Sequence, residues 1–66
     1  MSTAYTIHTA ELLAEAKEAI GHDIEIRYWN NQLHIMIDGR HRFAADESNC
    51  QSYLMGIIST SKLQTL

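Results

Sequence analysis

The stretch IEIRYWNNQLHIMI, residues 24–37, decides the fold. On each side of Asn30 and Asn31, an apolar residue recurs at every second position, which is typical of strands with one buried face. The two asparagines tolerate the positive φ angles of a tight primed turn. The stretch therefore predicts an antiparallel hairpin of two strands, residues 24–29 and 32–37, joined by a two-residue loop.

The length of this loop fixes which residues lie opposite each other. The predicted apolar pairs are Ile24–Ile37, Ile26–Ile35 and Tyr28–Leu33. In these three pairs an apolar residue of one strand meets an apolar residue of the other, and a slip by one residue would destroy the match. The pattern predicts a well-defined register.

The segment after this hairpin predicts a third strand, roughly residues 40–44. A two-residue turn after Ile37 would direct Arg40 and Arg42 into the core, which is unfavourable for unpaired guanidinium groups. A three-residue loop, residues 37–39, instead leaves both arginines outside. It also turns His41 toward the helices as a partly buried histidine. The pairs expected from this loop are Ile35–His41 and Leu33–Phe43.

The segment before the hairpin predicts an amphipathic helix over residues 9–20, with the threonine at its start as the N-cap. Gly21 follows in a position suited to a left-handed residue that ends the helix. In residues 1–8, the alternation of Tyr5 and Ile7 predicts a short edge strand, with a flexible end as the alternative. We therefore expect a helix in front of the sheet.

The segment after the sheet predicts a second amphipathic helix. Ser48 and Gln51 have the spacing of a capping box, and Asp46 is the rival cap. Apolar residues follow at steps of three and four, which suits packing on a sheet face. They are Cys50, Tyr53, Leu54, Ile57 and Ile58. Residues 60–66 are expected to form a fraying tail.

These elements predict one α+β domain over residues 1–66, in the order helix, three-stranded antiparallel sheet, helix (αβββα). Both helices need an apolar partner, so we expect them on one face of the sheet. A chain of 66 residues buries only about 60% of its unfolded surface, which makes its core thin. The thin core and the open strand edges favour pairing of two copies into a homodimer.

Composition disfavours several functional classes. Eight acidic and five basic residues give a net charge of −3, which disfavours nucleic acid as a partner. The single cysteine, Cys50, excludes an intramolecular disulfide, and its place on an apolar stripe is typical of a core residue. The chain has no apolar run of about 18 residues and no signal-peptide pattern. We therefore expect a cytoplasmic protein that does not contact membranes.

No group of residues predicts catalysis, a cofactor or a metal site. The carboxylates of the first helix share a solvated face, and no glycine-rich phosphate loop is present. The four histidines are His8, His22, His34 and His41, and their spacings match no metal-binding signature. The predicted register also places His34 and His41 on opposite faces of the sheet. We therefore expect a non-enzymatic protein without a cofactor.

The sheet face opposite the helices is the candidate partner-binding surface. The residues predicted to make contact are Arg27, Trp29, His34, Met36 and Arg42. Tryptophan, methionine and arginine are enriched at protein interfaces. A solvated sheet with Trp29 lying over its own hairpin is the alternative. We expect a protein partner and a role as regulator or inhibitor; accessory proteins of phages are similar in size and composition by analogy only.

The predicted order of elements is similar to that of the double-stranded RNA-binding domain. That family grips phosphates with basic residues at the start of its second helix. Here the corresponding residues, 45–48, read ADES and are acidic, so they would repel phosphate. The resemblance therefore implies a shared topology without the shared activity.

The segment IDGRHRFAA, residues 37–45, resembles the G-x-H-R or G-x-R-R segment of the ParB and sulfiredoxin families. The resemblance covers roughly residues 12–47. It implies that residues 40–45 open a helix and that the glycine and the arginine contact nucleotide phosphates. The alternative function is therefore a nucleotide- or nucleic-acid-binding module on the segment Asp38-Gly39-Arg40-His41-Arg42. Its candidate contact residues are Gly39, Arg40, His41 and Arg42.

Overall fold

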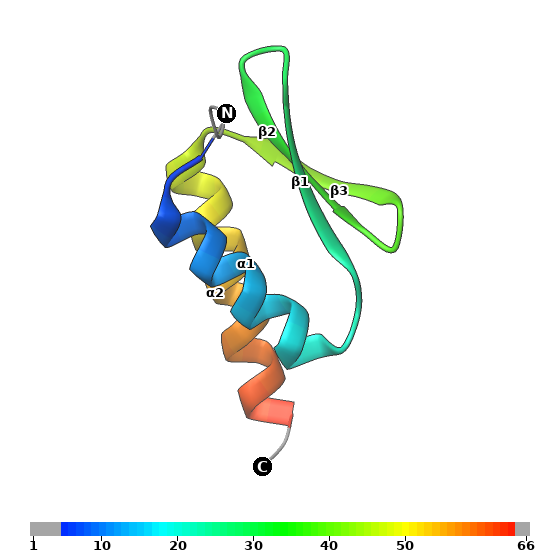
Figure 1. Ribbon diagram of the computed structural model, residues 1–66. Coiled ribbons are helices and arrows are strands. Elements are labelled where there is room, and N and C mark those ends of the chain that lie inside the picture. Colours follow the sequence, from blue (N-terminus) through cyan, green and yellow to red (C-terminus); the bar gives the residue numbers. More distant parts are fainter. Residues whose placement is uncertain (1–4, 65–66) are drawn as a thin grey trace.

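The computed structural model describes residues 5–64, which form a helix, three strands and a second helix (Figure 1). The elements are α1 (Ile7–Ile20), β1 (Ile24–Trp29), β2 (Gln32–Ile37), β3 (Arg40–Ala45) and α2 (Glu47–Gln64). The strands form one antiparallel sheet in the order β1-β2-β3, with β2 in the centre. The predicted α+β class and order of elements are confirmed.

Hairpin β1–β2 has the predicted register. The pairs include Ile24–Ile37, Ile26–Ile35 and Tyr28–Leu33. Asn30 and Asn31 have φ angles of 54° and 62°, as a primed turn requires. Tyr28 nevertheless stays 57% exposed, because the tip of this hairpin projects beyond the helices (Figure 1). Its hydroxyl donates to Asn31 Oδ1 at 3.3 Å.

Hairpin β2–β3 differs from the prediction. Its turn contains only two residues, so Ile37 pairs with Arg40, and the three-residue loop is wrong. The next pairs are Met36–His41 and Ile35–Phe43, with a register shift between them. Arg42 is therefore the extra residue of a β-bulge, which resets the alternation of faces by one position. Because of the bulge, Phe43 can point to the core although neither arginine is buried.

The predicted orientation of His41 is wrong because the turn is one residue shorter than predicted. His41 lies opposite Met36, on the sheet face away from the helices, and it is exposed. The bulge affects only the pairs after His41, so Leu33 pairs with Ala45 and not with Phe43.

Helix α1 begins earlier than predicted. Thr6 is its N-cap and accepts a hydrogen bond from the Thr9 amide. Residues 7–8 are helical, so the predicted edge strand is wrong there; residues 1–4 lie outside the described residues. Gly21 ends the helix with a φ angle of 67°, as predicted.

The start of α1 is tied to the start of α2 through one carboxylate. Glu47 Oε2 accepts hydrogen bonds from Thr6 N at 2.8 Å, Thr6 Oγ1 at 2.7 Å and Thr9 Oγ1 at 2.6 Å. Gln51 Nε2 donates to Thr9 Oγ1 at 2.8 Å, so this fully buried hydroxyl has partners on both sides. These bonds explain why the chain turns into a helix at Thr6.

Helix α2 is capped by the rival residue and extends further than expected. Asp46 Oδ1 accepts from Asn49 N at 3.0 Å, so Asp46 and not Ser48 is the N-cap. The helix continues through Gln64 and includes residues expected in the fraying tail. Ser61 Oγ donates to Ala19 O at 2.7 Å, which ties this part of α2 to α1.

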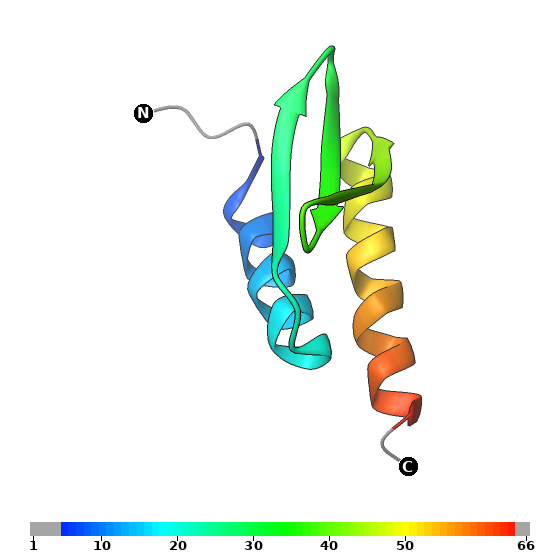
Figure 2. The same ribbon diagram turned by 90° about the vertical axis from the view of Figure 1, so that its right-hand side faces the viewer.

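Both helices pack on one face of the sheet (Figure 1, Figure 2). The core between the layers consists of Leu12, Ala16, Ile24, Ile26, Leu33, Ile35, Cys50, Leu54 and Ile58. At its border, Phe43 of β3 stacks on Tyr53 of α2 with ring centroids 4.6 Å apart. Within residues 5–64, no element covers the opposite face, which we call the outer sheet face.

Candidate functional site: the outer sheet face

Side chains from all three strands line one open hollow of about 450 Å³ on the outer sheet face. They are Arg27, Trp29, His34, Met36 and His41. Four of these five residues are among the predicted partner-binding residues. The indole of Trp29 is the largest of the side chains and is 69% exposed. We call this hollow the Trp29 hollow.

The register of the sheet explains why these side chains meet. Arg27 of β1 lies opposite His34 of β2. Met36 of β2 has partners on both neighbouring strands, and its partner on β3 is His41. The rings form a row across the sheet. The Trp29 and His34 centroids are 5.3 Å apart, and the His34 and His41 centroids are 5.1 Å apart. Three rings thus make one continuous surface.

The fifth predicted contact residue, Arg42, does not line the Trp29 hollow. It lines a separate hollow with Arg40, Asp38, His22 and Ile37. His41 takes its place on the outer sheet face, and sequence reasoning missed it because it predicted a three-residue loop where the turn has two residues. The signal in the sequence is the order RHRF: after a two-residue turn, strict alternation puts His41 outside but also Arg42 inside and Phe43 outside, and a bulge after His41 corrects the last two.

A chain of hydrogen bonds fixes the orientation of the two imidazoles. His34 Nε2 lies 2.9 Å from the carbonyl oxygen of Trp29. Because a carbonyl only accepts, Nε2 carries the hydrogen and Nδ1 of the neutral ring is an acceptor. His41 Nε2 lies 2.9 Å from that Nδ1, so His41 donates to His34. The partners thus assign the tautomer of both rings.

Arg27 is the one charged residue that lines the Trp29 hollow, and it forms an ion pair. Arg27 Nε donates to Glu25 Oε2 in an exposed ion pair, which contributes at most about 1 kcal/mol to stability. The other polar lining residues are two imidazoles, which are hydrogen-bonded to each other. No carboxylate is among the five lining residues. The hollow therefore combines apolar rings with one guanidinium whose remaining N–H groups can donate to a partner's carboxylate.

The segment proposed for phosphate binding is divided between two sites. Residues 40–45 form strand β3 and not the helix that the ParB and sulfiredoxin resemblance implies. His41 faces the outer sheet face, whereas Arg40 and Arg42 line the other hollow. Gly39 has a φ angle of 81° and serves the turn of the hairpin.

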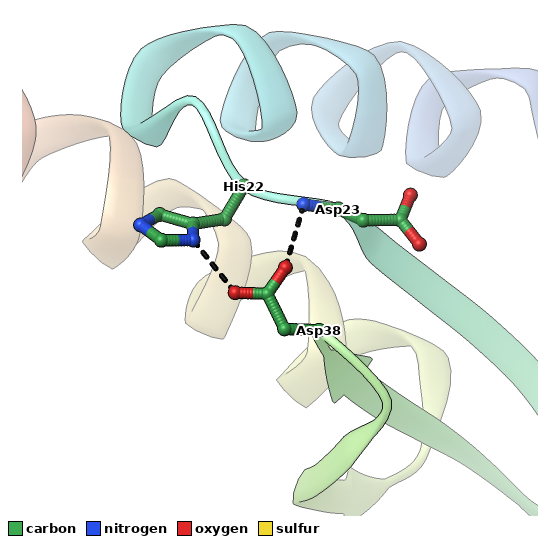
Figure 3. A network of polar contacts seen from close by, with 3 residues as sticks. All are labelled: His22, Asp23 and Asp38. Atoms are coloured by element: carbon green, nitrogen blue, oxygen red, sulfur yellow. Dashed lines mark hydrogen bonds and ion pairs between the residues drawn. The ribbon is translucent and has the colours of Figure 1, made fainter.

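A carboxylate lies beside these two arginines. Asp38 Oδ2 accepts from His22 Nδ1 at 2.6 Å, and Asp38 Oδ1 accepts from Asp23 N at 3.2 Å (Figure 3). The hydrogen bond from His22 lowers the pKa of Asp38 below its ordinary value of 3.8, against a smaller opposing effect of burial. The negative charge therefore persists at neutral pH and disfavours a phosphate in this place.

The remaining reactive group is the thiol of Cys50. It is buried, and its Sγ donates to Leu33 O at 3.5 Å. Burial raises the pKa of this thiol, so the sulfur stays protonated and is a poor nucleophile. Cys50 is thus a core residue in the structure.

Comparison with protein-family models, with curated proteins and with solved structures gave no match. In the described part of the chain, no helix has both the length and the apolar character needed to cross a membrane. The fold and the site define an α+β domain of αβββα order with one uncovered sheet face. The Trp29 hollow itself is therefore the feature from which a function can be inferred.

Proposed function

We propose that this chain is a small non-enzymatic protein-binding module, which acts as a regulator or inhibitor of the protein that it binds. One observation carries the proposal: Trp29 is 69% exposed in a hollow that all three strands build on the uncovered face of the sheet. Tryptophan and arginine are the residues most often found as interface anchors, and methionine adapts to varied partners. Trp29, Met36 and Arg27 meet here.

The partner that fits this hollow is a protein segment with an apolar side chain beside a carboxylate. The indole and the Met36 thioether provide the apolar contact, while the Arg27 guanidinium has N–H groups left to donate besides the Nε that binds Glu25. The net charge of −3 opposes a nucleic acid, whose phosphates supply a dense negative charge. We place the module in the cytoplasm, where its free, buried thiol is stable.

The proposal is tested by titration calorimetry with the partner recovered from the source cell and then purified. Trp29→Ala should weaken binding by about 2 kcal/mol, or roughly 30-fold, because it removes the central anchor. Arg40→Ala is the matched control on the other hollow and should change affinity less. Circular dichroism should report both variants as folded. A larger loss from Arg40→Ala, together with nucleotide binding by the parent chain, would replace this proposal with the phosphate-binding alternative.

A second copy of the chain is the other occupant to test, because a short chain gains stability from pairing. Light scattering at increasing micromolar concentrations measures this directly. A mass of two chains that Trp29→Ala returns to one would show self-association through the hollow and would remove the separate partner. A mass of one chain throughout removes the expected homodimer and leaves the hollow free for another protein.

A further inference from the structure

We propose that His34 and His41 form a binding site for one copper(II) ion, with Met36 as a weak additional ligand. The proposal is independent of the docking function because it is tested with the metal alone. It revises our expectation of no metal site, which assumed that the two histidines lie on opposite faces of the sheet. The two-residue turn Asp38-Gly39 pairs His41 with Met36 and thereby places both histidines on the same face.

The two ring nitrogens are joined by a hydrogen bond and lie close enough to bind the same ion once that bond is broken. His34 Nδ1 and His41 Nε2 are 2.9 Å apart. With metal–imidazole bonds of about 2.0–2.1 Å, two ligands at a right angle are about 2.9 Å apart, whereas tetrahedral ligands are about 3.3 Å apart. Square-planar or tetragonal nitrogen sites are typical of Cu(II) and Ni(II). The rings need to rotate so that both lone pairs aim at one point.

One of the two imidazoles already has the arrangement of a metal ligand. Coordinating histidines usually donate their second ring N–H to a carbonyl or carboxylate, which fixes the ring and its tautomer. His34 Nε2 donates in this way to the Trp29 carbonyl oxygen at 2.9 Å, so Nδ1 is left as the basic nitrogen. His41 is exposed to water, so its hydrogen can move from Nε2 to Nδ1 and free Nε2 for the metal, with no net proton released.

Met36 and the surrounding charges complete the site. Met36 pairs directly with His41 and lines the same hollow, and a thioether is a common weak axial ligand of copper. Arg27 is the nearby cation, and its charge is compensated by Glu25. Among residues 5–64, no third histidine, cysteine or carboxylate joins the pair, so water fills the other positions. The site is therefore open and accessible from solvent.

The fluorescence of Trp29 provides the measurement, since it is the only tryptophan and lies 5.3 Å from His34. Copper(II) quenches tryptophan at such short range. Titration of the full chain with copper(II) chloride near neutral pH should give quenching that saturates at one equivalent. Zinc(II) should bind less tightly, as the general order of metal affinities requires.

Two variants and one matched control decide the assignment. His41→Gln and His34→Gln should each weaken copper binding by about tenfold or more, because each removes one of two imidazole ligands. His22→Gln is the control, since this histidine is also exposed but binds Asp38 away from the hollow. It should leave the affinity unchanged. Circular dichroism checks that all three remain folded.

Electron paramagnetic resonance gives a second measurement that does not depend on affinity. The parent chain with one equivalent of copper(II) should show hyperfine coupling to two imidazole nitrogens, and His41→Gln to one. Equal affinity in the parent, His34→Gln and His41→Gln would overturn the proposal, as would coupling to a single imidazole in the parent. Loss of binding in His22→Gln would overturn it too.

Discussion

The two hairpins of this small sheet share strand β2 and close through turns of the same length, yet only one of them is regular. Both turns contain two residues with positive φ angles, 54° and 62° in the first and 53° and 81° in the second. Hairpin β1–β2 alternates strictly along its whole length. Hairpin β2–β3 contains a bulge after two pairs. The difference lies in the residues that follow each turn.

In the second hairpin, the bulge costs less free energy than strict alternation would. Strict alternation after the turn would direct Arg42 into the core and Phe43 to solvent. An unpaired buried charge destabilises a protein by about 3–5 kcal/mol. A lost ladder hydrogen bond costs about 0.5–1.5 kcal/mol. The bulge keeps the Arg42 guanidinium outside and the Phe43 ring on Tyr53, whereas the turn itself brings His41 beside His34.

The largest expected effect concerns the regular hairpin. Ile26→Asp should unfold the domain or destabilise it by about 3 kcal/mol or more, because it buries an unpaired carboxylate. Glu25→Lys, on the neighbouring position of the outer sheet face, should change the free energy of unfolding by about 1 kcal/mol or less. Urea denaturation followed by circular dichroism compares them. Similar tolerance of both would mean that the faces are wrongly assigned.

The second prediction concerns the bulge. Deletion of Arg42 removes the extra residue and leaves the pairs Met36–His41 and Ile35–Phe43 in place. We therefore expect a change of less than about 1 kcal/mol in the free energy of unfolding. Arg42→Ala, which keeps the residue but not the guanidinium, is the control. A loss of about 3 kcal/mol or more on deletion would indicate that β3 has no bulge, because Phe43 would then leave the core.

The smallest expected effect is a change in stability at acid pH. The first residue to test is Asp38, in the turn of the second hairpin. The pKa of Asp38 is lowered by its hydrogen bond from His22. A carboxyl whose pKa is lower in the folded state stabilises the protein at pH values above its unfolded pKa, here 3.8. This stabilisation is lost as the pH falls through the folded pKa. Thermal melts between about pH 6 and pH 2 should therefore decline less steeply in Asp38→Asn than in the parent.

Glu47 provides the comparison for the acid experiment. Hydrogen bonds from Thr9 and Thr6 lower its pKa below the ordinary 4.5, so its stabilisation is lost in the same direction, as the pH falls below that value. Glu47→Gln should likewise reduce the decline of the melting temperature in acid. If neither Asp38→Asn nor Glu47→Gln alters the decline, these two carboxylates do not carry the pH dependence.

Most of the fold was predictable because local patterns and global packing agree. The helix stop at Gly21, the turn at Asn30-Asn31 and the pairing of Ile26 with Ile35 are each confirmed. The errors concern ends and caps, where short-range signals compete. Thr9 and Ser48 have suitable hydroxyls, but Thr6, which Glu47 binds, caps α1, and Asp46, which accepts from Asn49 N, caps α2.

The candidate site was predictable in four of its five residues. Arg27, Trp29, His34 and Met36 lie on strands with strict alternation, so their face follows from the period of two. The two-residue turn puts His41 on the outer sheet face, and Arg42 becomes the extra residue of the bulge, so neither position followed from the predicted three-residue loop.

The sequence by itself determined the two helical stripes, the first hairpin and its register, since neighbouring side chains suffice to specify each of them. Only the tertiary structure decided which faces the residues after His41 occupy in β3. The turn alone would place Arg42 inside and Phe43 outside, whereas the Phe43 ring stacks on Tyr53 of α2. The period of two along β3 does not contain this contact, because it forms only when α2 packs on the sheet.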